Sequence, residues 1–439
     1  MRGKTGRVLD GKLMNIRGWS AKFLLVASSV LVGLLIVEVA LRAVGYTYPV
    51  FYTTDTERGY ALRPHMEGWY RKEGEAYVRI NSDGLRDREH TKTKPPDTLR
   101  IAVLGDSYAE ALQVPLENAF WMVMEARLKG CEAAGGGRTK IEVINFGVSG
   151  YSTAQELITL RQHVWDYSPD IVLVAVTTNN DITDNSRVFK KTDEIPYFVL
   201  RDNQLALDDS FRTSKAFRLR HSALNRAGRW IRDRLRFIQA LHQSHGAIKS
   251  FIASRRARRS ANADAQTQKR ATAENGVSDA QATDAATPNN AAAAQAEELG
   301  VDYMIYRPPA DEVWRDAWAV TERLMMQMRD EVESRGARFL VVTLSNAIQV
   351  HPEPRARQEF AKRLGVDDLL YPDLRLKALG EREGFEVLNL APSLQAYAEQ
   401  HKVFLHGAGS QIGNGHWNAH GHALAGELVA RRLCEVIAR

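Results

Sequence analysis

One serine and one histidine in this chain are placed so that together they could break an ester bond. Ser107 belongs to Gly105-Asp106-Ser107, which ends a short apolar run from Ile101 to Leu104. That run predicts a strand buried on both faces, and the carboxyl end of such a strand is where α/β proteins place their reactive groups. A serine hydroxyl is a weak nucleophile until a base removes its proton, and histidine suits that task near neutral pH. Taken alone, Gly-Asp-Ser is more often a turn or a helix cap than a reactive site.

Two further apolar runs end in small or amide residues. Ile141 to Phe146 runs into Gly147 to Gly150, and Ile171 to Val176 runs into Thr177 to Asp181. Attack on an ester creates an oxyanion, which the backbone N–H groups of Ser107 and Gly150 and the amide of Asn180 could hold. A glycine at position 150 leaves room for a substrate to reach its N–H group.

These residues, with His416 near the C-terminus, resemble the Ser, Gly, Asn and His blocks of the SGNH (GDSL-type) hydrolase superfamily. The resemblance covers about 100–185 and 337–439. It implies a three-layer α/β/α, flavodoxin-like fold with a parallel five-stranded sheet. It also implies a Ser107–His416 dyad and an oxyanion hole of Ser107, Gly150 and Asn180, without metal or other cofactor. The whole chain is similar to bacterial envelope members, several of which are esterases or O-acetyltransferases of envelope glycans.

The chain departs from the family's pattern at two places. Thr178 stands where the family has glycine in the third block, and Gly413 stands where it has the aspartate three residues before the histidine. Asn414, two residues before the histidine, or a backbone carbonyl could orient the imidazole, although neither offers a full negative charge. An acid from elsewhere in the chain is the other possibility. Without any such group, the chain would be a non-catalytic glycan-binding or polysaccharide-assembly protein.

The remaining segments predict the elements that position these residues. Arg338 to Leu344 and Phe385 to Leu390 predict two more strands, and helical patterns cover Asp311 to Arg335, Asp373 to Arg382 and Ala419 to Ala438. Alternating strands and helices indicate a parallel sheet with helices on both faces. His420 and His422 lack a zinc-type spacing from His416, so we expect them to pack or to start the last helix.

The N-terminus indicates a membrane anchor. Residues 1–22 carry six basic residues against one acid, and 23–44 are apolar apart from Glu38 and Arg42. We expect an uncleaved, single-pass anchor in the bacterial inner membrane, with the basic segment in the cytoplasm and the body in the periplasm. A cleaved signal peptide is the rival interpretation. The net charge of +6 permits an anionic partner without choosing one.

Between anchor and sheet, 45–98 should form a stalk and a small lead-in, and 99–439 the hydrolase-like domain. An insertion at about 186–308 opens with a basic part from Arg212 to Arg236 that carries an apolar stripe. That part is either a helix on lipid headgroups or a helix packed on the domain with a solvated basic face. The stretch 261–296 lacks large apolar residues and should be disordered. We expect no nucleic acid partner, an O-acylated glycan or lipid as substrate, and leave the oligomeric state open.

The two cysteines lie toward the far ends of two predicted helices. Cys131 follows the helix after the first strand, and Cys434 lies in the last helix, which begins just after His416. If Ser107 and His416 meet, these helices leave the same site and should be neighbours on one face of the sheet. We therefore expect a Cys131–Cys434 disulfide in an oxidising compartment, with two buried free thiols as the alternative.

Overall fold

The structure is a computed structural model that describes residues 6–131, 140–244 and 300–438, with side chains described from residue 21 onward. The described residues form two compact units. One unit comprises those of Met1–Val50 and Ala223–Gln281, and the other those of Phe51–Ser222 and Ala282–Arg439.

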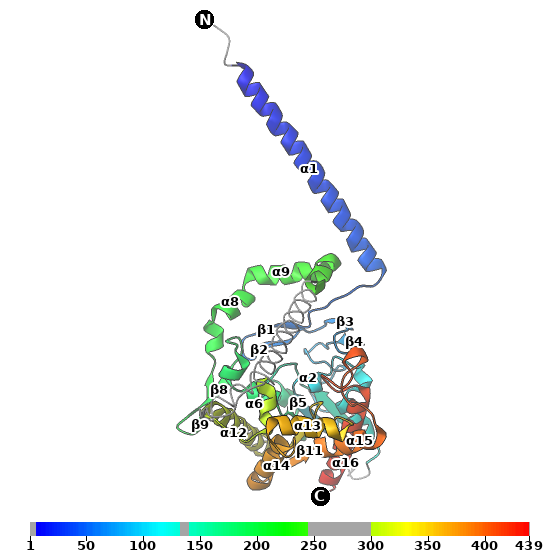
Figure 1. Cartoon of the computed structure of the whole chain (residues 1–439), viewed down its shortest axis with the longest axis vertical. Coiled ribbons are helices and arrows are strands. Elements are labelled where there is room, and N and C mark those ends of the chain that lie inside the picture. Colours follow the sequence, from blue (N-terminus) through cyan, green and yellow to red (C-terminus); the bar gives the residue numbers. More distant parts are fainter. Residues whose placement is uncertain (1–5, 132–139, 245–299, 439) are drawn as a thin grey trace, which may run out of the picture. The chain divides into compact units, whose positions relative to one another are not determined.

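A five-stranded sheet lies at the centre of the larger unit (Figure 1). Its strands, in the spatial order β11-β10-β7-β5-β6, all pair in parallel. They are β5 (Thr98–Gly105), β6 (Lys140–Asn145), β7 (Ile171–Thr177), β10 (Arg338–Leu344) and β11 (Glu386–Asn389). Every residue of β5 and β7 is buried, which explains why their sequences are continuous apolar runs. The predicted parallel five-stranded α/β fold is confirmed.

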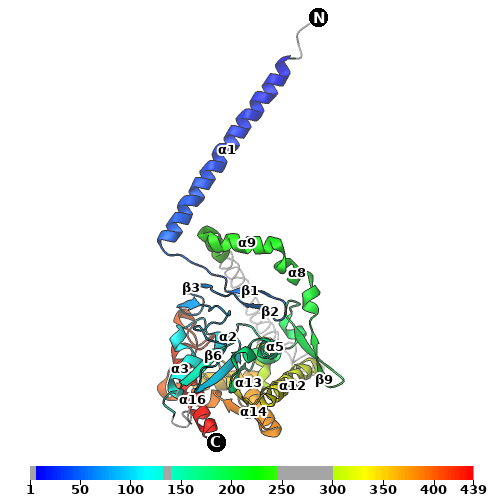
Figure 2. The same cartoon turned by 180° about the vertical axis from the view of Figure 1, so that it is seen from behind.

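Helices cover both faces of this sheet (Figures 1 and 2). The side chains of one face form a core with α3 (Phe120–Leu128), α15 (Ala391–His401) and α16 (Ala419–Ile437). Those of the other face form a core with α5 (Thr153–Gln162), α12 (Glu312–Ser334), α13 (Pro354–Leu364) and α14 (Tyr371–Glu383). The sequence patterns predicted α12, α14 and α16 to within about two residues, whereas α13 and α15 were not expected.

The segment before the sheet folds onto the larger unit from Phe51 onward. It forms two antiparallel hairpins, β1 (Tyr52–Asp55) with β2 (Gly59–Leu62) and β3 (Glu67–Tyr70) with β4 (Ala76–Arg79). Their small core includes Leu112 and Val148, which lie just beyond the carboxyl ends of β5 and β6. The hairpins therefore pack at the edge of the sheet where the site residues were expected.

The insertion after β7 contributes a third hairpin and two helices. These are β8 (Tyr197–Arg201), β9 (Gln204–Asp208), α8 (Lys215–His221) and α9 (Ala223–Arg234). The predicted disordered stretch 261–296 lies outside the described residues. The remaining short helices are α2 (Ser107–Glu110), η1 (Leu116–Asn118), η2 (Val164–Tyr167), α6 (Asn180–Thr183), α7 (Arg187–Lys190), η3 (Ser210–Thr213), η4 (Val301–Tyr306) and η5 (Gly409–Gln411).

A long N-terminal helix, α1 (Gly6–Ala43), contains the apolar segment. Its part from Ala21 to Ala43 is long and apolar enough to cross a membrane, a property that a signal anchor and a signal sequence share. The predicted boundaries, 23–44, differ from this span by two residues or fewer.

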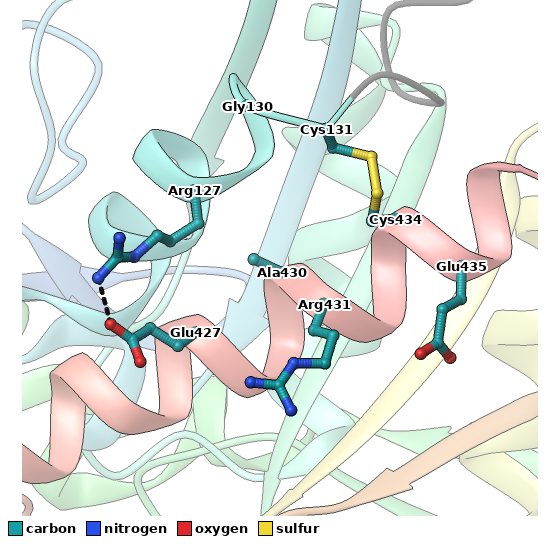
Figure 3. A pocket seen from close by; sticks show the side chains of 8 residues that line it. All are labelled: Arg127, Gly130, Cys131, Glu427, Ala430, Arg431, Cys434 and Glu435. Carbon is teal, nitrogen blue, oxygen red and sulfur yellow. Dashed lines mark hydrogen bonds and ion pairs between the residues drawn. A yellow bond between two sulfur atoms is a disulfide. The ribbon is translucent and has the colours of Figure 1, made fainter.

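A disulfide joins Cys131 to Cys434, as predicted, with Cα atoms 6.0 Å apart (Figure 3). It connects the chain just after α3 to α16, and these two helices lie side by side in the same core. An open pocket of about 520 Å³ surrounds the disulfide, and the Arg127–Glu427 ion pair lines it. Cys131 lies on the connection that leads to the amino end of β6, whereas Ser107 follows the carboxyl end of β5. The pocket and Ser107 are therefore at opposite ends of the strands.

Candidate active site

The turn that ends β5 presents Ser107. Asp106 caps the following helix α2: its Oδ1 accepts a hydrogen bond from the N–H of Tyr108 at 3.0 Å. Ser107 is the first residue of α2 and is only half-buried, whereas Asp106 is completely buried. The serine hydroxyl is therefore accessible on a turn that the buried carboxylate holds in place.

His416 reaches this hydroxyl from the far end of the chain. Its Nε2 lies 2.7 Å from Ser107 Oγ. His406 and Trp417 form an isolated antiparallel β-bridge, which closes the loop that contains His416. Trp417 is fully buried. The two residues that the sequence proposed as a dyad are in direct hydrogen-bond contact.

The other imidazole nitrogen contacts a carboxylate that the sequence did not identify. Glu73 Oε2 forms a hydrogen bond with His416 Nδ1 and lies 3.4 Å from the His416 backbone nitrogen. Glu73 lies in the loop between β3 and β4, 343 residues before His416 in the chain. Gly415 permits this approach, since its φ is +73° and a Cβ there would lie 3.0 Å from Glu73 Oε2.

The structure thus differs from the expectation for Asn414. Its side chain is exposed and makes no hydrogen bond to His416 among the described residues. The β3–β4 hairpin provides the acid from elsewhere in the chain. Because a carboxylate can only accept, Nδ1 carries the proton, and Nε2 is left to accept the Ser107 hydroxyl proton.

The electrostatics of the pair follow from this contact. Burial alone would lower the pKa of His416, but the hydrogen bond and charge of Glu73 outweigh burial and raise it. The hydrogen bond to His416 lowers the pKa of Glu73, against the opposing effect of burial. Glu73 is therefore ionised at neutral pH and favours the protonated imidazole, the form that a histidine takes after accepting a proton.

Asp106 also connects the turn to Asn180. Its Oδ2 accepts from Asn180 Nδ2 at 3.0 Å, and its Oδ1 accepts from the hydroxyl of Thr177 at 2.9 Å. An amide nitrogen carries two hydrogens, so the second hydrogen of Asn180 remains for another acceptor. The carboxylate next to Ser107 thus ties the end of β7 to the end of β5.

Gly150 lies in a loop held against α2. Buried Glu110 of α2 accepts from the N–H of Ser149 at 2.7 Å, and Tyr60 donates its hydroxyl to the Ser149 carbonyl at 2.8 Å. Gly150 has a φ of +76°, and a Cβ there would lie 2.8 Å from the Tyr60 hydroxyl, so only glycine fits. Lys190 Nζ lies 3.4 Å from the Gly150 carbonyl oxygen, and no sequence motif indicated this neighbour.

Two further histidines support this region as neutral groups. Burial lowers the pKa of His406 to about 4 and that of His422 to about 3. His406 Nδ1 lies 2.8 Å from the carbonyl oxygen of Gly415, next to His416. His422 Nδ1 accepts from the N–H of Phe120 at 3.2 Å, in agreement with the packing role expected from the sequence.

Solved structures of several esterases are similar to this chain. An acetyl xylan esterase, AlAXEase, is 12% identical over 77% of this chain and 99% of its own, with a TM-score of 0.34. The acetylxylan esterase Axe2 of Geobacillus stearothermophilus is 10% identical over 77% and 94%, with a TM-score of 0.32. A lipolytic protein of the G-D-S-L family from Desulfitobacterium hafniense DCB-2 is 11% identical over 76% and 98%, with a TM-score of 0.30. No protein-family model and no curated protein sequence matches the chain. At these identities and scores the function has to be derived from the site.

Proposed function

We propose that the protein is a serine acyl hydrolase or O-acyltransferase with a Ser107–His416–Glu73 triad. The observation that carries the proposal is the continuous hydrogen-bonded chain from hydroxyl to imidazole to carboxylate. Three residues from distant parts of the sequence meet in the order that activates a serine. A serine that only capped a helix would need neither partner.

In the proposed reaction, His416 takes the hydroxyl proton while Ser107 Oγ attacks the acyl carbonyl carbon. Glu73 holds the Nδ1 proton and stabilises the imidazolium that results. The N–H groups of Ser107 and Gly150 and the amide of Asn180 stabilise the oxyanion. Collapse of the intermediate expels the alcohol, which takes the proton from His416 and leaves an acyl-serine. Water or a second hydroxyl then accepts the acyl group, giving hydrolysis or transfer respectively.

We propose an O-acylated envelope glycan as the substrate, with an acylated lipid as the alternative. The solvent-facing side of the hairpin that carries Glu73 supports a glycan. Trp69 and Tyr77 pair across its strands with ring centroids 5.6 Å apart, and both side chains are exposed. Exposed aromatic rings on the hairpin that carries a residue of the triad suit the apolar faces of sugar rings.

The non-catalytic alternative depended on the missing aspartate before His416. Glu73 supplies a carboxylate at the same nitrogen, so this reason for doubting catalysis is removed. For the setting of the reaction, we propose that α1 remains as a single-pass anchor in the bacterial inner membrane, with the catalytic unit in the periplasm. The apolar segment of α1 supports the anchor, and the disulfide supports an oxidising compartment.

The test is ester turnover by the purified full-length protein and its Ser107→Ala variant, with p-nitrophenyl acetate as substrate. We expect the variant to lose turnover while its melting temperature stays unchanged, because the hydroxyl is half-exposed and removing it leaves the turn intact. Ser186→Ala is the matched control, since Ser186 has the same partial burial as Ser107 and its side chain makes no capping hydrogen bond. Similar turnover by Ser107→Ala and wild type would refute the proposal.

A further inference from the structure

The smaller unit contains a helix whose apolar stripe faces solvent. Along α9 the apolar residues Leu224, Ala227 and Ile231 recur at helical spacing and so share one face. Leu224 is 80% exposed and Ile231 42% exposed, and α9 has no buried residue. A helix packed on a protein core would bury this stripe, so the packed-helix interpretation of the basic segment does not hold for α9, whereas α8 in the same segment buries Phe217.

The rest of α9 is strongly basic. The helix carries four arginines and one aspartate, with Arg226, Arg229 and Arg232 spaced three apart on the side away from the stripe. Trp230, at the border between the two faces, is 57% exposed, and the guanidinium of Arg234 stacks 4.0 Å above its ring. An apolar stripe, an arginine-rich face and a bordering tryptophan are the composition of helices that lie in the plane of a membrane surface.

The segment that follows α9 is bonded to the end of the apolar helix α1, within the same compact unit. Glu38, the buried acid of α1, accepts from the N–H of Phe237 at 3.0 Å. Arg42 donates to the carbonyl of Arg234, the last residue of α9, at 2.6 Å. Gln239 accepts from the N–H of Tyr48 at 2.9 Å.

Because the bonded residues are the last residue of α9 and residues just after it, these contacts fix the depth at which α9 ends. Glu38 lies five residues before the end of the span at Ala43, which corresponds to about 7.5 Å along a helix axis. In a bilayer crossed by Ala21–Ala43, the hydrogen bond between Glu38 and Phe237 would lie near the boundary between acyl chains and headgroups. A helix that lies in the plane of a membrane surface is found at this depth.

We propose that α9 is a second membrane contact, which lies on an anionic phospholipid surface with Leu224, Ala227 and Ile231 in the acyl-chain boundary. The arginines of α9 contact the lipid phosphates. The hydrogen bonds to Glu38 and from Arg42 hold α9 beside the anchor. The inference rests on the membrane anchor of the proposed function and is independent of the ester chemistry.

The test uses the full-length chain in vesicles of phosphatidylcholine with phosphatidylglycerol. Both native cysteines are in the disulfide, so an added cysteine is the only thiol that an NBD fluorophore would label. The labels are placed at Ala227 in α9, at Leu31 in α1 and at exposed Tyr397 in α15, each replaced by cysteine. A lipid-borne nitroxide quenches only a fluorophore that enters the bilayer.

We expect the emission of the label at 227 to shift to shorter wavelength and the nitroxide lipid to quench most of its intensity. Quenching should be weaker in vesicles of pure phosphatidylcholine. Raising the salt concentration should weaken the quenching, because salt screens the arginines. Leu224→Asp with Ile231→Asp should abolish it, whereas the label at 397 should stay unquenched throughout. If these variants fail to fold, the salt and lipid dependence of the parent chain decides.

Quenching at 31 without quenching at 227 would overturn the α9 proposal and leave the anchor intact. A label at 227 that shifts its emission but resists the lipid quencher would overturn it too, because protein would then cover the stripe. The absence of quenching at 31 would overturn the anchor itself, and the α9 contact with it.

Discussion

Glu73 is the residue that changes the interpretation of the site. Catalysis by Ser107 and His416 requires an imidazole that is oriented and whose protonated form is stabilised. The Glu73 carboxylate does both, since it accepts a hydrogen bond from Nδ1–H and raises the pKa of His416. An amide at Asn414 would have supplied orientation without charge.

Glu73→Gln should therefore lower kcat by roughly 100- to 10,000-fold, the range that acid–base catalysis contributes. His416 acts as a base only when neutral, so activity should rise with pH through its raised pKa. Without the Glu73 charge that pKa falls, and the acidic limb of the kcat/KM profile should move to lower pH. Glu75→Gln, in the same loop, is the control, because Glu75 pairs with exposed Arg71. An unchanged rate and an unmoved limb in Glu73→Gln would contradict the assignment.

A second residue-scale prediction concerns buried Glu156 of α5. Neither of its carboxylate oxygens has a hydrogen-bond partner among the described residues, and burial raises its pKa well above the ordinary value of 4.5. The folded state therefore keeps a proton that the unfolded state loses, so stability falls as pH rises from 4.5 toward the raised pKa.

Glu156→Gln should remove this fall, which amounts to about 1.4 kcal/mol per pH unit over that window. Urea unfolding of the two proteins across pH measures it. At neutral pH the variant should be the more stable, and Glu75→Gln should follow the wild type. Parallel pH curves for Glu156→Gln and wild type would show that Glu156 is ionised in the folded state.

At the scale of elements, the sequence predicted the sheet well because buried parallel strands leave a continuous apolar pattern. The five expected strands correspond to β5, β6, β7, β10 and β11; they are Ile101 to Leu104, Ile141 to Phe146, Ile171 to Val176, Arg338 to Leu344 and Phe385 to Leu390. Helix α13 was missed because its sequence is mostly polar, and α15 because it mixes apolar and polar residues; long-range packing stabilises both. Glu73 could not be found from sequence because the β3–β4 loop has no motif, and only the fold brings it to His416.

The α3–α16 pair leads to a stability prediction, because the disulfide closes a loop of 303 residues. In the chain-entropy model, such a loop contributes at most roughly 6 kcal/mol. Cys131→Ser with Cys434→Ser should therefore lower the melting temperature by roughly 10 °C. Reductant should lower the melting temperature of the wild type by a similar amount and leave the double variant unchanged. Equal melting temperatures of wild type and variant would show that packing of α3 against α16 stabilises this region without any contribution from the disulfide.

At the scale of the whole molecule, we propose that one chain contains a catalytic unit and a membrane-bound unit. The basic flank before Phe23 should remain in the cytoplasm, which places everything after Gly45 outside. The sequence predicted this topology from charge alone, but the residues that bond α1 to the chain beyond α9 had no sequence signal.

An alkaline phosphatase fused after Gly45 should therefore be active, since that enzyme matures only outside the cytoplasm. A cytoplasmic reporter fused at the same point should be silent and serves as the matched control. The reverse pattern would contradict the topology. Release of an active, soluble phosphatase fusion would instead indicate a cleaved signal peptide.

The central claim is that His416 and Glu73 activate Ser107 as a nucleophile. Fluorophosphonate labelling of the full-length protein, followed by peptide mass spectrometry, tests it most directly, because the probe reacts covalently with activated serines and needs no knowledge of the substrate. We predict one labelled peptide, modified at Ser107, with labelling much slower in His416→Ala and Glu73→Gln and unchanged in Glu75→Gln. An unlabelled Ser107 in the folded wild-type protein, or labelling that does not depend on His416, would contradict the claim.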